Sequence, residues 1–134
     1  MITALTLAAT LAACHADMLA YSEHTKQAAA KTYPKAAEDL QRTEVFIGTP
    51  APGRLAEVVY GGFRPKVPKG WGFVPVDYNN RITLSSKLCD LPVEKRHEAV
   101  RHELGHVLAR AERGQWIVDS EAVADAYGDT LGDR

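Results

Sequence analysis

The stretch RHELGHVL, residues 101–108, decides how this sequence is interpreted, because it places two histidines four positions apart in a helical pattern. Residues i and i+4 of an α-helix share one face, so the imidazoles of His102 and His106 can converge on one point. Two imidazoles in this arrangement are typical zinc ligands. Glu103 is rotated by one helical step, too far to be an obvious ligand but near enough to reach a metal-bound water. The alternative is a helix that merely contains two histidines.

The helix that carries this motif is predicted from Pro92 to the residue before Gly114. Asp90 or Leu91 is expected to cap its start, Pro92 suits the first turn, and glycine is common just past a helix end. Apolar residues at helical spacing predict a stripe that faces the core: Val93, Val100, Leu104, Val107, Leu108 and Ala111.

A second helix follows closely, and it carries two further acidic residues. In SEAVAD, Glu121 and Asp125 lie four positions apart on one helical face, after a cap at Asp119 or Ser120. The connection from His106 is short. We therefore expect the second helix to pack back against the first and to bring Glu121 to the metal.

HExxH followed by ExxxD resembles the gluzincin zinc peptidases, the clan that includes thermolysin. The resemblance implies that zinc is bound by His102, His106 and Glu121. It further implies that Glu103 is the general base and that Asp125 hydrogen-bonds a zinc-binding histidine.

The resemblance covers roughly residues 81–128, and in size the chain is similar to the minimal one-domain gluzincins. We therefore expect one α+β, zincin-like catalytic domain over residues 21–134. It would contain N-terminal helices, a small, mostly antiparallel sheet, the active-site helix and a C-terminal glutamate helix. The metzincin pattern fails, because Ala109 replaces its glycine and Glu112 its third ligand.

The region before the motif divides into a helical part and a strand part. Helix-forming residues interrupted by Pro34 predict one helix to about Thr32 and a second from about Lys35. From Thr43 onward, short β-branched or aromatic runs separated by proline and glycine predict the sheet. These runs are EVFIG, LAEVVYG, WGFVPV and RITLSS.

The N-terminal segment, residues 1–20, has two interpretations that stay open. Its uncharged start is about as long as the apolar part of a signal peptide and too short to span a bilayer, so we expect no transmembrane span. LAAC, residues 11–14, resembles the lipobox of bacterial lipoproteins, which implies export and a lipid anchor at Cys14. No Lys or Arg precedes it, so the alternative is a cytoplasmic protein in which this segment is a helix packed on the domain.

Composition limits the class of protein. The chain has 134 residues, enough for one domain with its own core. Its 16 Lys and Arg are interspersed with 17 Asp and Glu, so we expect no nucleic-acid partner, which would require a basic stripe. Cys14 and Cys89 are too few for a disulfide framework, and whether they form one bridge remains open.

The substrate-binding residues are less marked in the sequence. RITLSS precedes the motif helix, and its alternation directs Ile82 and Leu84 to the core and Thr83 and Ser85 away from it. If this strand is a sheet edge, Thr83 and Ser85 could receive an extended peptide by strand addition. An internal strand is the alternative.

A side chain that stabilises the transition state is also expected near the metal. Tyr78, Tyr127 and His97 are candidates, and none of them is favoured. His97 falls on the apolar stripe, where a hydrogen-bonded core histidine is the expected role.

Together these features predict a zinc-dependent metallopeptidase that cleaves a polypeptide substrate through a zinc-bound water activated by Glu103. One alternative is a non-catalytic binding module that keeps the zincin fold. The presence of Glu103 argues against this alternative, because loss of the general base is expected in a site that has lost its activity. Another is a phage or lipoprotein accessory factor with a vestigial zinc site, whose helices in residues 16–42 mediate assembly.

Overall fold

The computed structural model describes residues 4–61, 79–114 and 120–132, which form an α+β fold with four α-helices and a small mixed sheet. Two 3-10 helices, labelled η, complete the described part. In chain order the elements are α1 (Ala4–Thr32), η1 (Pro34–Ala36), α2 (Ala37–Gln41), β1 (Thr43–Gly48), β2 (Ala56–Val59), β3 (Asn80–Ser85), η2 (Ser86–Asp90), α3 (Val93–Arg113) and α4 (Glu121–Asp129).

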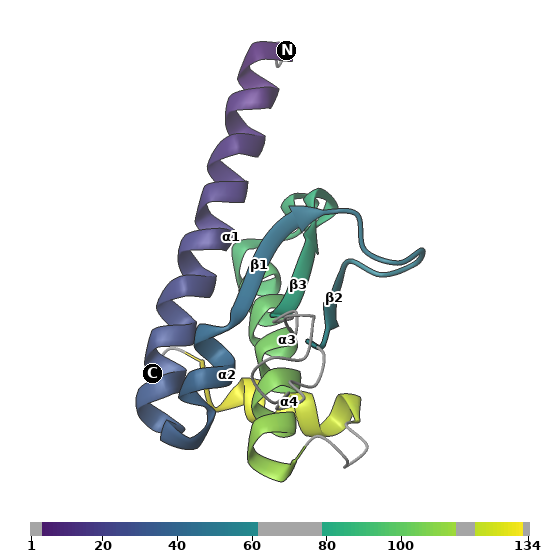
Figure 1. Cartoon of the computed structure of the whole chain (residues 1–134). Helices are drawn as coiled ribbons and strands as arrows, with labels where there is room; N and C mark the ends of the chain where they lie inside the picture. The colour runs from purple at the N-terminus through teal and green to yellow at the C-terminus, as the bar shows by residue number, and fades with distance from the viewer. Residues whose placement is uncertain (1–3, 62–78, 115–119, 133–134) are drawn as a thin grey trace, which may run out of the picture.

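The end of α1 and the start of α2 lie close to the predicted positions near Thr32 and Lys35, while α1 itself begins at Ala4 and includes most of the N-terminal segment 1–20. α1 ends at Thr32, before the residue that precedes Pro34, because proline disfavours helical backbone in its predecessor. Figure 1 shows α1 as one unbroken helix whose N-terminal half projects beyond the sheet. Its buried residues Met18 and Ala29 belong to the core. Within the described ranges, no helix is both long enough and apolar enough to cross a membrane.

The sheet has the order β1-β3-β2, with β3 in the centre. β1 pairs with β3 in parallel and places Phe46 opposite Thr83, whereas β2 pairs with β3 antiparallel. Within the described residues the sheet is therefore mixed rather than mostly antiparallel as predicted, since one of its two pairings is parallel. A parallel pairing needs a long connection, and residues 49–79 provide it. The predicted strand at residues 71–76 lies outside the described residues.

The hydrophobic core lies between the sheet and the helices α1 and α3 (Figure 1). Ile82 and Leu84 of β3 are fully buried, as the alternation predicts. The predicted stripe of α3 is confirmed through its middle, where Val100, Leu104 and Leu108 are fully buried. Val93 at the start of α3 is instead 44% exposed.

The start of α3 differs from the prediction by one residue, and its cap differs as well. The helix begins at Val93 with Pro92 as its N-cap, and no side chain caps it. Asp90 is not available as a cap because it belongs to η2, which continues directly from β3. At the other end, Gly114 follows the helix with φ 94°, a conformation that glycine adopts without strain.

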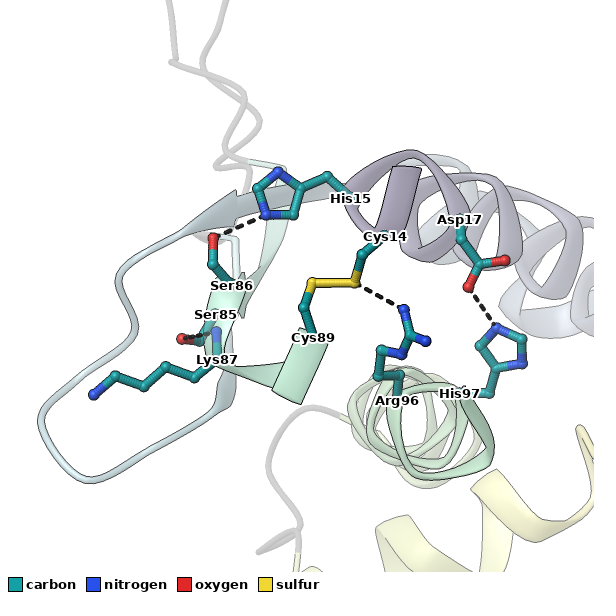
Figure 2. The surroundings of a disulfide bond; sticks show 9 residues. All are labelled: Cys14, His15, Asp17, Ser85, Ser86, Lys87, Cys89, Arg96 and His97. Carbon is teal, nitrogen blue, oxygen red and sulfur yellow. Dashed lines mark hydrogen bonds and ion pairs between the residues drawn. A yellow bond between two sulfur atoms is a disulfide. The ribbon is translucent and has the colours of Figure 1, made fainter. Parts of the chain in front are cut away.

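A disulfide bond between Cys14 and Cys89 ties α1 to η2 (Figure 2). The guanidinium of Arg96 donates to the Cys14 sulfur at 2.8 Å, and His97 Nε2 lies 3.0 Å from an Asp17 carboxylate oxygen. These contacts join α1 to α3 as well. A Cys14 sulfur in this bond cannot also carry a lipid thioether, so the disulfide-bonded and lipid-anchored forms exclude each other.

Candidate metal site

Two glycines allow α4 to cross α3 in direct backbone contact (Figure 1). A Cβ atom on Gly105 would lie 2.1 Å from the carbonyl oxygen of Ala124, and one on Gly128 would lie 2.8 Å from the carbonyl oxygen of Arg101. Any side chain at either position would push the helices apart. Glycine inside a helix costs about 1 kcal/mol relative to alanine, so a glycine there often has a packing reason. The glycines in HELGH and AYG could therefore have indicated a close helix crossing from the sequence.

The start of α4 orients the acidic residues that face α3. Ser120 is the N-cap, and its hydroxyl accepts a hydrogen bond from the Val123 N–H at 3.2 Å. The other predicted cap, Asp119, lies outside the described residues. Glu121 therefore begins the helix and Asp125 follows one turn later, on the side that meets His102.

The side chains of His102, His106 and Glu121 converge, and their nearest donor atoms lie within 4.8 Å of one another. His102 Nε2 is 2.6 Å from one Glu121 oxygen, and His106 Nε2 is 3.3 Å from the other. The two imidazole rings meet edge to face with centroids 4.8 Å apart. The group is close enough to bind a metal ion through two nitrogens and a carboxylate oxygen.

Asp125 holds His102 from the opposite side of its ring. Its carboxylate lies 2.5 Å from His102 Nδ1, which leaves Nε2 directed at Glu121. Burial lowers the pKa of His102, but the hydrogen bonds to Asp125 and Glu121 outweigh burial and raise the pKa above its usual value. With acceptors at both ring nitrogens, the metal-free form favours the imidazolium. A metal ion must displace the proton on Nε2, so we expect its affinity to fall in acid.

Glu103 is buried, with 8% of its surface exposed. Burial raises the pKa of its carboxyl group, while the positive charges of the two histidines and of Arg54 lower it in part. Glu103, His106 and Glu121 all line one open cavity of about 540 Å³. A carboxylate with a raised pKa beside a metal-binding group is suited to accept and return a proton.

The sheet forms the other wall of this cavity. Residues from β2 and its flanks line it: Arg54, Leu55, Ala56, Val58 and Tyr60. The guanidinium of Arg110 lies over the ring of Tyr60, 4.2 Å from its centroid, and so braces that ring. Sequence reasoning did not select Arg54 or Tyr60. The alternation of LAEVVYG identifies a strand but does not show which helix it covers.

Thr83 and Ser85 are not positioned as the sequence predicts for a substrate-binding edge. Both belong to β3, which is the central strand, with neighbours on both sides. Ser85 is buried, and its hydroxyl accepts a hydrogen bond from the Lys87 N–H at the start of η2. Strand addition at β3 is therefore excluded, because its backbone groups are already used. Within the described residues, β2 is the outer strand beside the metal-binding group.

Of the candidates for transition-state stabilisation, His97 and Tyr127 are not among the described residues that line this cavity. His97 is stacked on Tyr21 of α1 at 3.7 Å and pairs with Asp17, so it is a half-buried, hydrogen-bonded histidine at a helix interface. Tyr127 contacts the ring of Tyr33 edge to face. Tyr78 lies outside the described residues.

Comparisons with known proteins match this chain to no family model, no curated protein and no solved structure. What the site does must therefore be inferred from its geometry and chemistry.

Proposed function

We propose that this protein is a zinc-dependent metallopeptidase that hydrolyses peptide bonds. The observation that carries the proposal is the convergence of His102, His106 and Glu121 beside the buried carboxylate of Glu103, at the wall of an open cavity. Two histidines and one carboxylate leave a fourth coordination position for water or substrate, the pattern of catalytic rather than structural zinc sites.

The donor set fits zinc in chemistry, and its atoms lie within 4.8 Å of one another, close to the spacing that zinc requires. Tetrahedral ligands about 2.0–2.1 Å from zinc lie roughly 3.3–3.4 Å from each other. His106 Nε2 lies 3.3 Å from Glu121 Oε1, which matches this value, whereas His102 Nε2 lies 2.6 Å from the other carboxylate oxygen, Oε2, which is a hydrogen-bond distance. Asp125 on His102 Nδ1 supplies the contact that zinc-bound histidines usually make through their other ring nitrogen.

Each residue has a distinct role in the proposed reaction. When bound, zinc supplies a Lewis acid that lowers the pKa of a coordinated water to about 7. Glu103 accepts the proton of the attacking water and delivers it to the leaving amine. Its raised pKa favours this exchange, because the carboxyl group holds a proton more readily than an exposed glutamate.

The outer edge of β2 is the proposed place for the substrate backbone. β2 lines the cavity with Ala56 and Val58, and in the described part of the chain it pairs only with β3. An extended peptide added to this edge would form main-chain hydrogen bonds and pass beside Glu103. Such binding demands little of the substrate side chains.

The test combines metal content with turnover. The purified chain is loaded with one equivalent of zinc and incubated with a quenched fluorescent peptide library, with and without a chelator. We expect cleavage that the chelator abolishes and added zinc restores. The matched control is Glu103→Gln, which should keep zinc and lose cleavage.

Two results would overturn the proposal. If the folded chain binds zinc no more tightly than a His102→Ala, His106→Ala double variant, these residues do not form a zinc site. If zinc-loaded Glu103→Gln cleaves peptides at the wild-type rate, Glu103 is not the general base and the proposed mechanism is wrong.

A further inference from the structure

The cavity at the candidate metal site has an uneven distribution of charge. From the helices it is lined by Glu103, His106 and Glu121, and from the sheet by apolar residues, Tyr60 and one arginine, Arg54. Arg54 is exposed and is the one cationic side chain of Lys or Arg type among the described lining residues. A divalent metal ion would balance the two glutamates, so Arg54 would leave the loaded cavity with excess positive charge.

A rigid turn fixes the backbone that carries this arginine. In APGR, residues 51–54, the Arg54 N–H donates to the Ala51 carbonyl oxygen at 3.0 Å. Pro52 occupies the second turn position, and Gly53 the third with φ 81°, the arrangement that a type II β-turn requires. The turn thus presents Arg54 at a defined position at the start of β2.

β2 itself is held at both ends. The Ser85 N–H donates to the Leu55 carbonyl oxygen at 2.8 Å, next to Arg54, and the Gly61 N–H donates to Asn80 Oδ1 at 2.8 Å beyond the other end. The backbone from Arg54 to Gly61 is therefore anchored to β3 across the cavity wall. A side chain on this frame can contribute to specificity because the backbone that carries it is already ordered and loses little conformational freedom on binding.

No residue in the described ranges forms a hydrogen bond or ion pair with the guanidinium of Arg54. Within this part of the chain its N–H donors are therefore available to an outside group, although its charge acts on the nearby carboxyl group of Glu103. A guanidinium presents paired N–H groups that match the two oxygens of a carboxylate. The same side chain repels lysine and arginine.

We propose that Arg54 is a specificity-determining residue that binds an acidic side chain of the peptide substrate, so that the site selects peptides with aspartate or glutamate near the cleaved bond. This inference rests on the proposed peptidase function. Because Arg54 precedes β2, the acidic side chain would lie toward one end of a peptide added to that strand, not beside the metal.

The first experiment measures cleavage. Otherwise identical quenched peptides carry glutamate, alanine or lysine at each position around the cleaved bond. We expect a preference of about fivefold in kcat/KM for glutamate at one position, expressed mainly in KM, as for a partly exposed ion pair. Arg54→Ala should remove this preference, and Arg54→Glu should transfer it to lysine. The matched control is Arg81→Ala, an exposed arginine of β3 that does not line the cavity.

The second experiment measures binding without turnover. Fluorescence anisotropy gives the affinity of labelled glutamate, alanine and lysine peptides for Glu103→Gln, with and without Arg54→Ala. Tighter binding of the glutamate peptide that depends on Arg54 supports the inference even if no peptide is cleaved, in which case the proposed function alone fails. Cleavage with no preference for acidic residues overturns the inference and leaves the function. Equal binding of all three peptides, with no selective cleavage, also overturns the inference.

Discussion

Replacing Gly105 with alanine tests whether the close crossing of α3 and α4 holds the metal-binding group together. An alanine Cβ would lie 2.1 Å from the Ala124 carbonyl oxygen, whereas ordinary contacts begin at 3.4 Å. The helices must therefore separate by about 1.3 Å, several times the roughly 0.2 Å tolerance of metal–ligand distances. Glu121 and Asp125 both lie on α4 and would move with it. We expect zinc affinity to fall at least about 100-fold, the upper end of the loss from a supporting contact.

The substitution Gly105→Ala should not destabilise helix α3 itself. Alanine is a better helix former than glycine by about 1 kcal/mol, so circular dichroism should show the helical content of the wild type. Zinc affinity is measured by competition with a chromophoric chelator. The matched control is Gly132→Ala, where the nearest heavy atom to the new Cβ lies at 3.5 Å, and it should bind zinc normally.

A second glycine makes the test independent of a single variant. Gly128→Ala introduces a contact of 2.8 Å with the Arg101 carbonyl oxygen, less severe than the contact at Gly105. Its affinity should therefore lie between those of Gly132→Ala and Gly105→Ala. Zinc binding by Gly105→Ala within about threefold of the wild type would show that the crossing does not position the ligands.

The remaining predictions concern individual side chains and the disulfide. Glu121→Ala should abolish tight zinc binding, whereas Asp125→Ala should weaken it only 10–100-fold, the range typical of a residue that orients a ligand. Chelator competition measures the zinc affinity of both variants, and a larger loss for Asp125→Ala than for Glu121→Ala would contradict the assigned roles. Glu103→Gln should lower turnover at least about 100-fold with zinc still bound, as measured by peptide cleavage and metal content. In the metal-free protein, burial raises the pKa of Glu103, so the ionised form costs stability. Glu103→Gln should therefore raise the unfolding midpoint at neutral pH, with a gain that disappears in acid, where wild-type Glu103 is protonated; a gain independent of pH would refute this cause. Replacing Cys14 and Cys89 by serine removes a cross-link between residues 75 positions apart and should lower the unfolding free energy by at most about 4.5 kcal/mol in the chain-entropy model. A denaturant midpoint that is the same in this variant and the wild type, and that reductant does not change in the wild type, would argue against the bond.

The candidate ligands could be selected from sequence because helical geometry is local. The spacing of His102 and His106 determines that they share a face, and the same holds for Glu121 and Asp125. The structure brings the first three of these within metal-binding distance and places Asp125 against His102.

The position of RITLSS in the sheet could not be predicted from sequence, because it depends on distant segments: this strand is central, so the edge interpretation of Thr83 and Ser85 is wrong and the internal strand is confirmed. Alternation showed which side chains of RITLSS enter the core, and Ile82 and Leu84 are indeed buried. It could not show whether that strand is central or at the edge, since this depends on which other strands pair with it. β1 and β2 cover both sides of β3, so Thr83 and Ser85 cannot receive a peptide backbone.

The sequence alone determined the features that depend on neighbouring residues: the helical periods, their ends near Thr32 and Gly114, and the faces that carry histidine and carboxylate. Only the tertiary structure decided the contacts between segments distant in sequence. These are the pairing of Cys14 with Cys89, the parallel register of β1 on β3, and the approach of α4 to α3. The physical reason is that each such contact depends on packing across the whole core. There, Gly105 and Gly128 set how closely α3 and α4 approach, and therefore whether their side chains lie close enough to share one metal ion.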